Sequence, residues 1–80
     1  MKVALQVNMT RANAFNVASD VCKYLERFGI TALIDNKLSD IFKNTAAVFL
    51  DADNCIKECD IVISIGGDGT IIHSAHDAAE

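Results

Sequence analysis

The sequence predicts an α/β fold, in which a small open sheet of three parallel strands is flanked by helices. Short apolar segments at residues 2–8, 30–34 and 61–65 are separated by segments with helical periodicity, which is typical of a parallel sheet. The last of these apolar segments is mostly β-branched and apolar at nearly every position, as expected of a strand buried on both faces. We expect the strand order second, first, third, with the first strand in the centre.

The first β-α-β unit begins with a strand at residues 2–8, where larger aliphatic residues alternate with Ala4 and Gln6. A helix is predicted over residues 13–28, because apolar residues recur there at spacings of three and four. These residues are Ala14, Ala18, Val21, Leu25 and Phe28, and Phe15 and Cys22 widen the apolar stripe that they form. Gly29 supplies the C-terminal stop of the helix, and the second strand follows at residues 30–34. The two strands should be parallel, with a right-handed crossover.

The segment between residues 35 and 50 has two possible structures. Apolar residues at helical spacing, with Asn36 or Ser39 as a cap, favour a helix. The alternative is an extended segment over residues 46–50. Asp51 or Asp53 should then begin a short helix that ends near Glu58, with caps and turns as the role of these two aspartates.

A glycine-rich turn, Gly66-Gly67-Asp68-Gly69-Thr70, directly follows the third strand. Glycine tolerates positive φ and lets the backbone approach a ligand closely, and Thr70 can cap a following helix. Free N–H groups and the positive end of a helix both favour an anion such as phosphate. Asp68 is itself anionic, so its place beside a phosphate requires that it hold a metal, a sugar hydroxyl or a proton.

The residues after Thr70 favour a helix over a β-hairpin. Apolar residues at positions 71, 72, 75, 78 and 79 have helical spacing. An Asp-Gly pair between apolar runs is also a hairpin signal, and this remains the less favoured alternative.

Composition excludes several classes of function. Eighty residues make a single domain. The net charge of -4, without a basic stripe, argues against nucleic acid, and no apolar run approaches the length of a membrane span. Three cysteines without metal-ligand spacing predict reduced thiols, a cytoplasmic location and no metal site made by the chain itself. Open strand edges and uncovered apolar faces predict a homo-oligomer.

The glycine-rich turn and the residues around it resemble the NAD kinase family. The motif Gly66–Thr70 follows a strand that begins with Asp60-Ile61-Val62, and Asn8 stands where the family often has Asn-Pro. Met9 replaces that proline, so the first loop departs from the pattern. Diacylglycerol and sphingosine kinases share the motif, and phosphofructokinases carry a near variant. Lipid kinases follow it with Asn-Glu, whereas the sequence Ile71-Ile72-His73-Ser74-Ala75 is similar to NAD kinases.

This resemblance implies a fold, a reaction and roles for individual residues. Residues 1–80 would be the Rossmann-like N-terminal domain of a longer, two-domain kinase. That kinase phosphorylates the 2′-hydroxyl of the adenosine ribose of NAD to give NADP, with ATP or polyphosphate as donor and Mg²⁺ or another divalent cation. Asp68 would be the catalytic base. The nucleotide-binding residues would be Gly66, Gly67, Asp68, Gly69, Thr70, His73 and Asn8.

Three other functions remain open from the sequence. One is a lipid or sugar kinase that shares the motif, another is a non-catalytic nucleotide-binding module, and the third is a structural domain whose turn is only a turn. The predicted strand order indicates where a ligand would bind for any of these functions. Ligands of such sheets bind beyond the C-terminal ends of the strands, where the strand order reverses, so Asn8 and the Asp68 turn should lie side by side.

Overall fold

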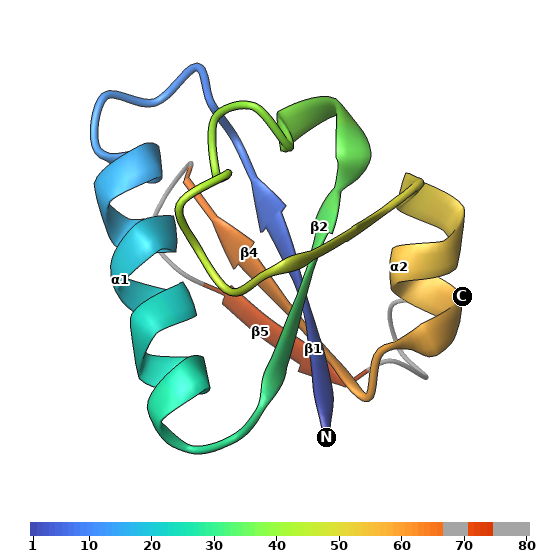
Figure 1. Cartoon of the computed structure of the whole chain (residues 1–80). Helices are drawn as coiled ribbons and strands as arrows, with labels where there is room; N and C mark the ends of the chain where they lie inside the picture. Colours follow the sequence, from blue (N-terminus) through green and yellow to red (C-terminus); the bar gives the residue numbers. More distant parts are fainter. Residues whose placement is uncertain (67–70, 75–80) are drawn as a thin grey trace.

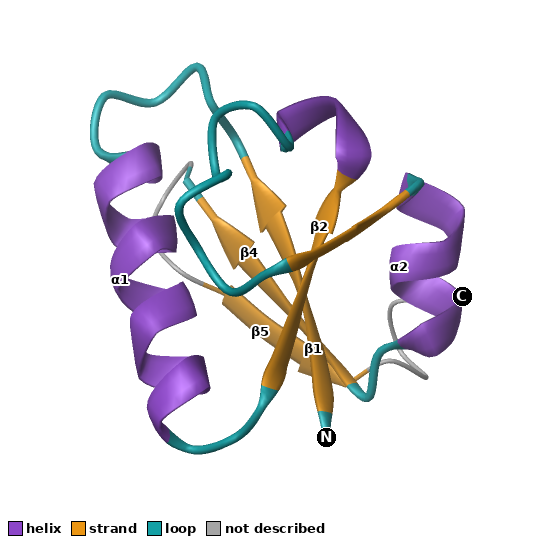
Figure 2. Ribbon diagram, viewed as in Figure 1, coloured by secondary structure: helices purple, strands orange, loops and turns teal. Residues whose placement is uncertain are grey.

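A single five-stranded sheet with a helix on each face makes up the fold (Figures 1 and 2). The computed structural model describes residues 1–66 and 71–74. The elements are β1 (Lys2–Val7), α1 (Ala14–Arg27), β2 (Thr31–Asp35), the 3-10 helix η1 (Asn36–Leu38), β3 (Val48–Leu50), α2 (Ala52–Glu58), β4 (Ile61–Ile65) and β5 (Ile71–Ser74). No helix among these described residues is long and apolar enough to cross a membrane.

The strand order is β3-β2-β1-β4-β5, with β1 in the centre. Strands β1, β2, β3 and β4 are parallel, and β5 pairs with β4 in the antiparallel direction. The three predicted strands therefore form the middle of the sheet in the predicted order, and the sheet extends by one strand on each side. In β1 and β4, Val7 pairs with Ile65, so these two strands end together.

Helix α1 covers one face of the sheet, and the small side chains on its buried side allow the helix to pack closely on the strands. Ala14, Ala18 and Cys22 are buried on the side of α1 that contacts the sheet. They pack in the same cluster as Leu5 and Ile34, which are almost completely buried. The helix ends as predicted, because Gly29 follows it with a φ of 69°.

Of the residues that the structure describes, the seven-residue helix α2 covers part of the opposite face of the sheet. Cys55 and Cys59 of this helix region pack on Ala4, Leu33 and Val62. The N-terminus of α2 is capped by Asp51, whose Oδ1 accepts a hydrogen bond from the Asn54 backbone N–H at 2.8 Å. Asp51 is thus the residue that begins the helix, as one of the two sequence alternatives proposed.

The helix predicted between residues 35 and 50 is wrong, and the extended alternative is correct at its end. Only Asn36–Leu38 forms a short 3-10 helix, and Val48–Leu50 is strand β3, paired with β2. The apolar spacing has a different cause, because Phe42 is buried from a loop and stacks on Phe15 with ring centroids 5.3 Å apart. Pairing with β3 also satisfies the outer edge of β2, which a helix would have left open.

The helix predicted after Thr70 is also wrong. Ile71–Ser74 forms β5, which pairs with β4 as in the hairpin alternative. The β-branched Ile71 and Ile72 favour a strand, and this strand satisfies the backbone groups on the outer edge of β4. The cap predicted at Thr70, and the later part of that helix at residues 75–80, lie outside the described residues.

Candidate functional site

The candidate site lies at the edge of the sheet where β1 and β4 end. The backbone N–H of Asn8 donates to the carbonyl oxygen of Ile65 at 2.8 Å, which continues the pairing of the two strands by one residue. The chain then turns toward α1 after Asn8, whereas the glycine-rich turn begins at Gly66. Open parallel sheets bind their ligands in a crevice beyond the carboxyl ends of their strands, so this edge is the candidate crevice of the fold.

Gly66 has a backbone geometry that only glycine fits. Its φ is 113°, and a Cβ atom at this position would lie 2.8 Å from the Cβ of Asn8. The same atom would lie 3.3 Å from the carbonyl oxygen of Asn8 and 3.4 Å from Cγ of Arg11. The predicted proximity of Asn8 to the start of the glycine turn is therefore confirmed at Gly66.

The side chain of Asn8 is fixed by its own loop. Its Oδ1 accepts hydrogen bonds from the backbone N–H of Thr10 at 3.2 Å and from the hydroxyl of Thr10 at 2.6 Å. Such an Asx turn uses the acceptor, and the two N–H donors of the amide have no partner among residues 1–66 and 71–74. Asn8 therefore presents donors at the crevice, which suits a ligand with oxygen acceptors.

The remaining residues of the motif cannot be compared with the structure in the same way. Gly67, Asp68, Gly69 and Thr70 lie outside the described residues. The backbone of His73 belongs to β5 and pairs with Val62, four positions before Gly66 along β4. This register sets the His73 backbone back from the edge of the sheet where β4 ends.

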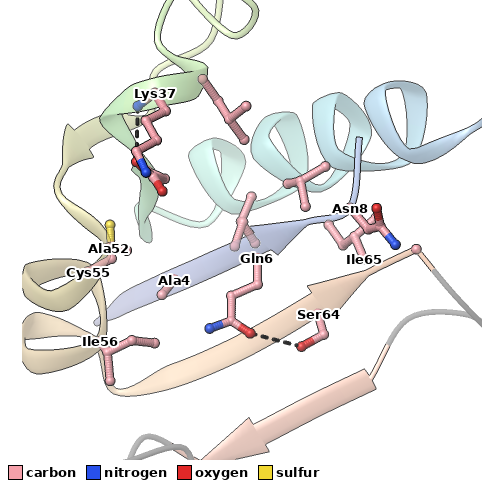
Figure 3. A pocket seen from close by; sticks show the side chains of 14 residues that line it. Ala4, Gln6, Asn8, Lys37, Ala52, Cys55, Ile56, Ser64 and Ile65 are labelled. Carbon is pink, nitrogen blue, oxygen red and sulfur yellow. Dashed lines mark hydrogen bonds between the residues drawn. The ribbon is translucent and has the colours of Figure 1, made fainter. Parts of the chain in front are cut away.

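A cavity of about 570 Å³ extends from Gly66 along the sheet face that α2 partly covers (Figure 3). We call it the α2-face cavity. Its lining comes from β1, β2, β4, η1 and α2. The residues are Ala4, Leu5, Gln6, Val7, Asn8, Asp35, Lys37, Leu38, Ala52, Cys55, Ile56, Ser64, Ile65 and Gly66.

Two polar side chains from neighbouring strands form a pair in this cavity. Gln6 and Ser64 are partners in the register of β1 and β4, and the Ser64 hydroxyl donates to Oε1 of Gln6 at 3.4 Å (Figure 3). Sequence reasoning identified neither residue as a site residue, nor Lys37. A signal was present, because glutamine and serine interrupt strands that are otherwise apolar.

The cysteines of the fold are inert packing groups. Burial raises the pKa of the Cys22, Cys55 and Cys59 thiols above the ordinary value of 9.0. Thiols with raised pKa values stay protonated near neutral pH, so they are poor nucleophiles and poor metal ligands. Residues 1–66 and 71–74 contain no group of three or more His, Cys, Asp or Glu side chains placed to hold a metal ion.

Comparisons with known proteins point to one group of enzymes. The chain is 30% identical over 76 residues to an NAD kinase of Prosthecochloris aestuarii, covering 95% of this chain and 26% of the relative. It is 29% identical over 75 residues to an NAD kinase of Citrifermentans bemidjiense, covering 92% and 26%. A bifunctional NADP phosphatase/NAD kinase of Methanococcus maripaludis is 36% identical over 62 residues, covering 78% and 11%.

The other two comparisons found no match. No family model matches the chain, and no solved structure matches it. The similarity is spread over nearly the whole chain, which spans about a quarter of the length of the NAD kinases that it matches.

Proposed function

The chain belongs to the NAD kinase family, and from this premise we propose that it forms one side of the site that phosphorylates NAD. The proposed reaction transfers the terminal phosphate of ATP or polyphosphate to the 2′-hydroxyl of the adenosine ribose, giving NADP. The observation that carries the proposal is the crevice between β1 and β4. There Gly66 lies against Asn8, at the position where such sheets bind ligands.

Phosphoryl transfer depends on positioning and on charge stabilisation more than on covalent participation of the protein. In the proposed site, the backbone N–H groups of the glycine turn and the donors of Asn8 bind oxygen atoms of the nucleotides. Thr70 is proposed as a further contact. His73 is proposed on the family resemblance alone, since its backbone lies back from the edge of the sheet where β4 ends. Gly67 and Gly69 leave room for the ribose or phosphate to approach the backbone.

Asp68 is the proposed catalytic base. It accepts the proton of the 2′-hydroxyl as that oxygen bonds to the terminal phosphorus of the donor and the bond from phosphorus to the leaving oxygen breaks. A base of this kind must lie within hydrogen-bond reach of the hydroxyl. A carboxylate flanked by glycines on both sides can approach a ribose closely, which supports this role.

Mg²⁺ or another divalent cation is proposed to accompany the phosphate donor and to offset its charge. Among the described residues no cluster of ligands fits a metal ion. We therefore propose no ligand for the cation among residues 1–66 and 71–74. The phosphate oxygens of the donor would bind the cation instead.

A panel of acceptors tests the proposed function against the other kinases that share the motif. The protein at its full natural length is incubated with Mg²⁺, ATP or polyphosphate, and one acceptor: NAD, a diacylglycerol, sphingosine or fructose 6-phosphate. The proposal predicts transfer of phosphate to NAD alone, with NADP identified by mass spectrometry. Phosphorylation of a lipid or sugar instead of NAD would replace the proposed function with that of the competing kinase.

A further inference from the structure

Gln6 occupies an unusual position for a side chain of a central strand. β1 pairs with a strand on each side, yet Gln6 is exposed, because α2 covers Ala4 but does not extend over Gln6. The α2-face cavity occupies this open part of the sheet (Figure 3). Its volume of about 570 Å³ falls within the range of about 300–1000 Å³ that small-molecule sites occupy.

The amide of Gln6 has hydrogen-bonding groups to offer a ligand. Its Oε1 accepts one long bond, 3.4 Å, from the Ser64 hydroxyl, so it retains a lone pair. Its Nε2 donates to none of the residues that the structure describes. An acceptor beside a donor on one planar amide matches adenine, which presents an N6 amino donor next to a ring-nitrogen acceptor.

The walls around Gln6 suit a flat and largely apolar group. Ala4, Cys55 and Ile56 line the inner part of the cavity, and Ala52 and Leu38 line it from α2 and η1 (Figure 3). The Cys55 thiol donates to the carbonyl oxygen of Leu50 at 3.6 Å, so it presents a neutral surface. A purine ring placed here would exchange water for apolar contacts on its faces.

The lining of the cavity also includes polar residues near its two ends. These are Asp35 and Lys37 at one end, and Asn8 and Gly66 at the other. The N–H donors of the Asn8 amide suit the oxygen atoms of a sugar or phosphate at that end. The same cavity therefore offers apolar contacts and the Gln6 amide to a base, and donors to a sugar and phosphates toward Asn8 and Gly66.

We propose that the α2-face cavity binds the adenosine part of a nucleotide, with Gln6 holding the edge of the adenine. The sugar and phosphates leave the cavity toward Asn8 and Gly66. This inference rests on the proposed function, since ATP and NAD both contain adenosine and either can be the source.

The test compares adenine with hypoxanthine, which lacks the 6-amino group. Calorimetry measures the dissociation constants of ATP and ITP, and separately of NAD and deamino-NAD, for the protein at its full natural length. One of the two pairs should show a preference for adenine of about 5- to 150-fold, the range expected of one bidentate contact. The pair that shows it identifies whether donor or acceptor supplies the adenosine.

Two variants at position 6 test whether Gln6 causes the preference for adenine. Gln6→Ala and Gln6→Met should both reduce the preference for adenine to about 1, because neither side chain carries the acceptor or the donor of the amide. Gln6 is exposed, so neither change disturbs the core, and circular dichroism checks the fold. Asn16→Ala, on the exposed surface of α1, is the control and should keep the preference.

The inference is overturned if both position-6 variants retain the preference for adenine. It is also overturned if the unaltered protein shows no such preference in either nucleotide pair. Either result leaves NADP formation in the acceptor panel untouched, so failure of the cavity is distinguishable from failure of the proposed function. A Gln6-dependent preference for adenine in a protein that makes no NADP would instead keep the cavity and remove the kinase reaction.

Discussion

Gly66 is the described residue whose replacement should most disturb the candidate site. Alanine there would adopt a φ near 113° and would place its Cβ 2.8 Å from the Cβ of Asn8. Gly29 is a matched control, because it also has positive φ, at 69°, but nothing lies within 4 Å of its added Cβ. Comparison of the two positions separates the strain of the backbone from the steric overlap.

Gly66→Ala is expected to lower the free energy of unfolding by more than Gly29→Ala does. Backbone strain of this kind costs about 1–3 kcal/mol, and the overlap with Asn8 adds to it only at Gly66. Urea denaturation of both variants measures the difference. Equal losses would mean that the loop at Asn8 moves aside freely, contrary to the tight crevice described above.

Asp68→Asn tests the chemistry of the motif at a single residue. Asparagine keeps the size and the turn preferences of aspartate but cannot take a proton. We expect the variant at full natural length to bind NAD nearly as well as the unaltered protein and to lose about 10²–10⁴-fold in rate, the range of a positioned acid or base. Turnover and NAD dissociation constants are measured separately, and a folded variant with normal turnover would exclude Asp68 as the base.

The buried thiols predict how stability depends on pH. Burial raises the pKa of the Cys22 thiol above 9.0 in the folded protein, so the unfolded chain releases this proton first as the pH rises. The stabilising contribution is therefore complete below pH 9 and is lost as the pH rises through the folded pKa. Urea midpoints at pH 7 to 10 should fall less steeply for Cys22→Ala than for the unaltered protein. Parallel curves for the two proteins would contradict this assignment.

At the scale of elements, the regular parts of the fold could be predicted from the sequence, and the segments decided by tertiary contacts could not. The helix at 14–27 has a continuous apolar stripe, and β1 and β4 have the composition of buried strands. In contrast, the apolar residues around Phe42 have helical spacing although they form no helix. Phe42 lies in a loop, and its ring packs in the core. Ile71–Ser74 forms a strand because it pairs with β4. The spacing of apolar residues along the chain does not indicate such a pairing.

The same division applies to the candidate site. The proximity of Asn8 and Gly66 followed from strand order alone, since parallel strands that are neighbours end at one edge of the sheet. Gln6, Ser64 and Lys37 were missed because their importance depends on which part of the sheet α2 leaves open. That depends on the length and position of a seven-residue helix, which the sequence pattern does not specify closely.

Helix α2 offers a test of its own, at its N-terminal cap. Asp51 accepts a hydrogen bond from the Asn54 backbone N–H at 2.8 Å and another from the Asn54 side chain at 2.9 Å. Asp51→Ala should therefore lower the free energy of unfolding by about 0.5–2 kcal/mol. Asp53→Ala is the control, because Asp53 lies in the first turn without capping it and should cost less. A larger loss at Asp53 would mean that charge near the helix end, and not the cap, stabilises α2.

For the whole molecule, the central issue is that these 80 residues correspond to about a quarter of the NAD kinases that they match. The candidate site lies at an edge of the sheet, where Asn8 and Gly66 follow the ends of β1 and β4. A phosphoryl-transfer site has to surround both donor and acceptor and exclude water. We therefore propose that this chain forms one side of a site and not the complete catalytic apparatus.

Formation of NADP, measured in parallel for the protein at full natural length and for residues 1–80 alone, tests this claim most directly. Both are purified, checked for folded structure by circular dichroism, and supplied with NAD, Mg²⁺ and either ATP or polyphosphate. We expect sustained NADP formation by the full-length protein and weak or undetectable formation by residues 1–80. Sustained turnover by residues 1–80 would contradict the claim that they form only one side of the site, and a folded full-length protein that makes no NADP with either donor would contradict the proposed function itself.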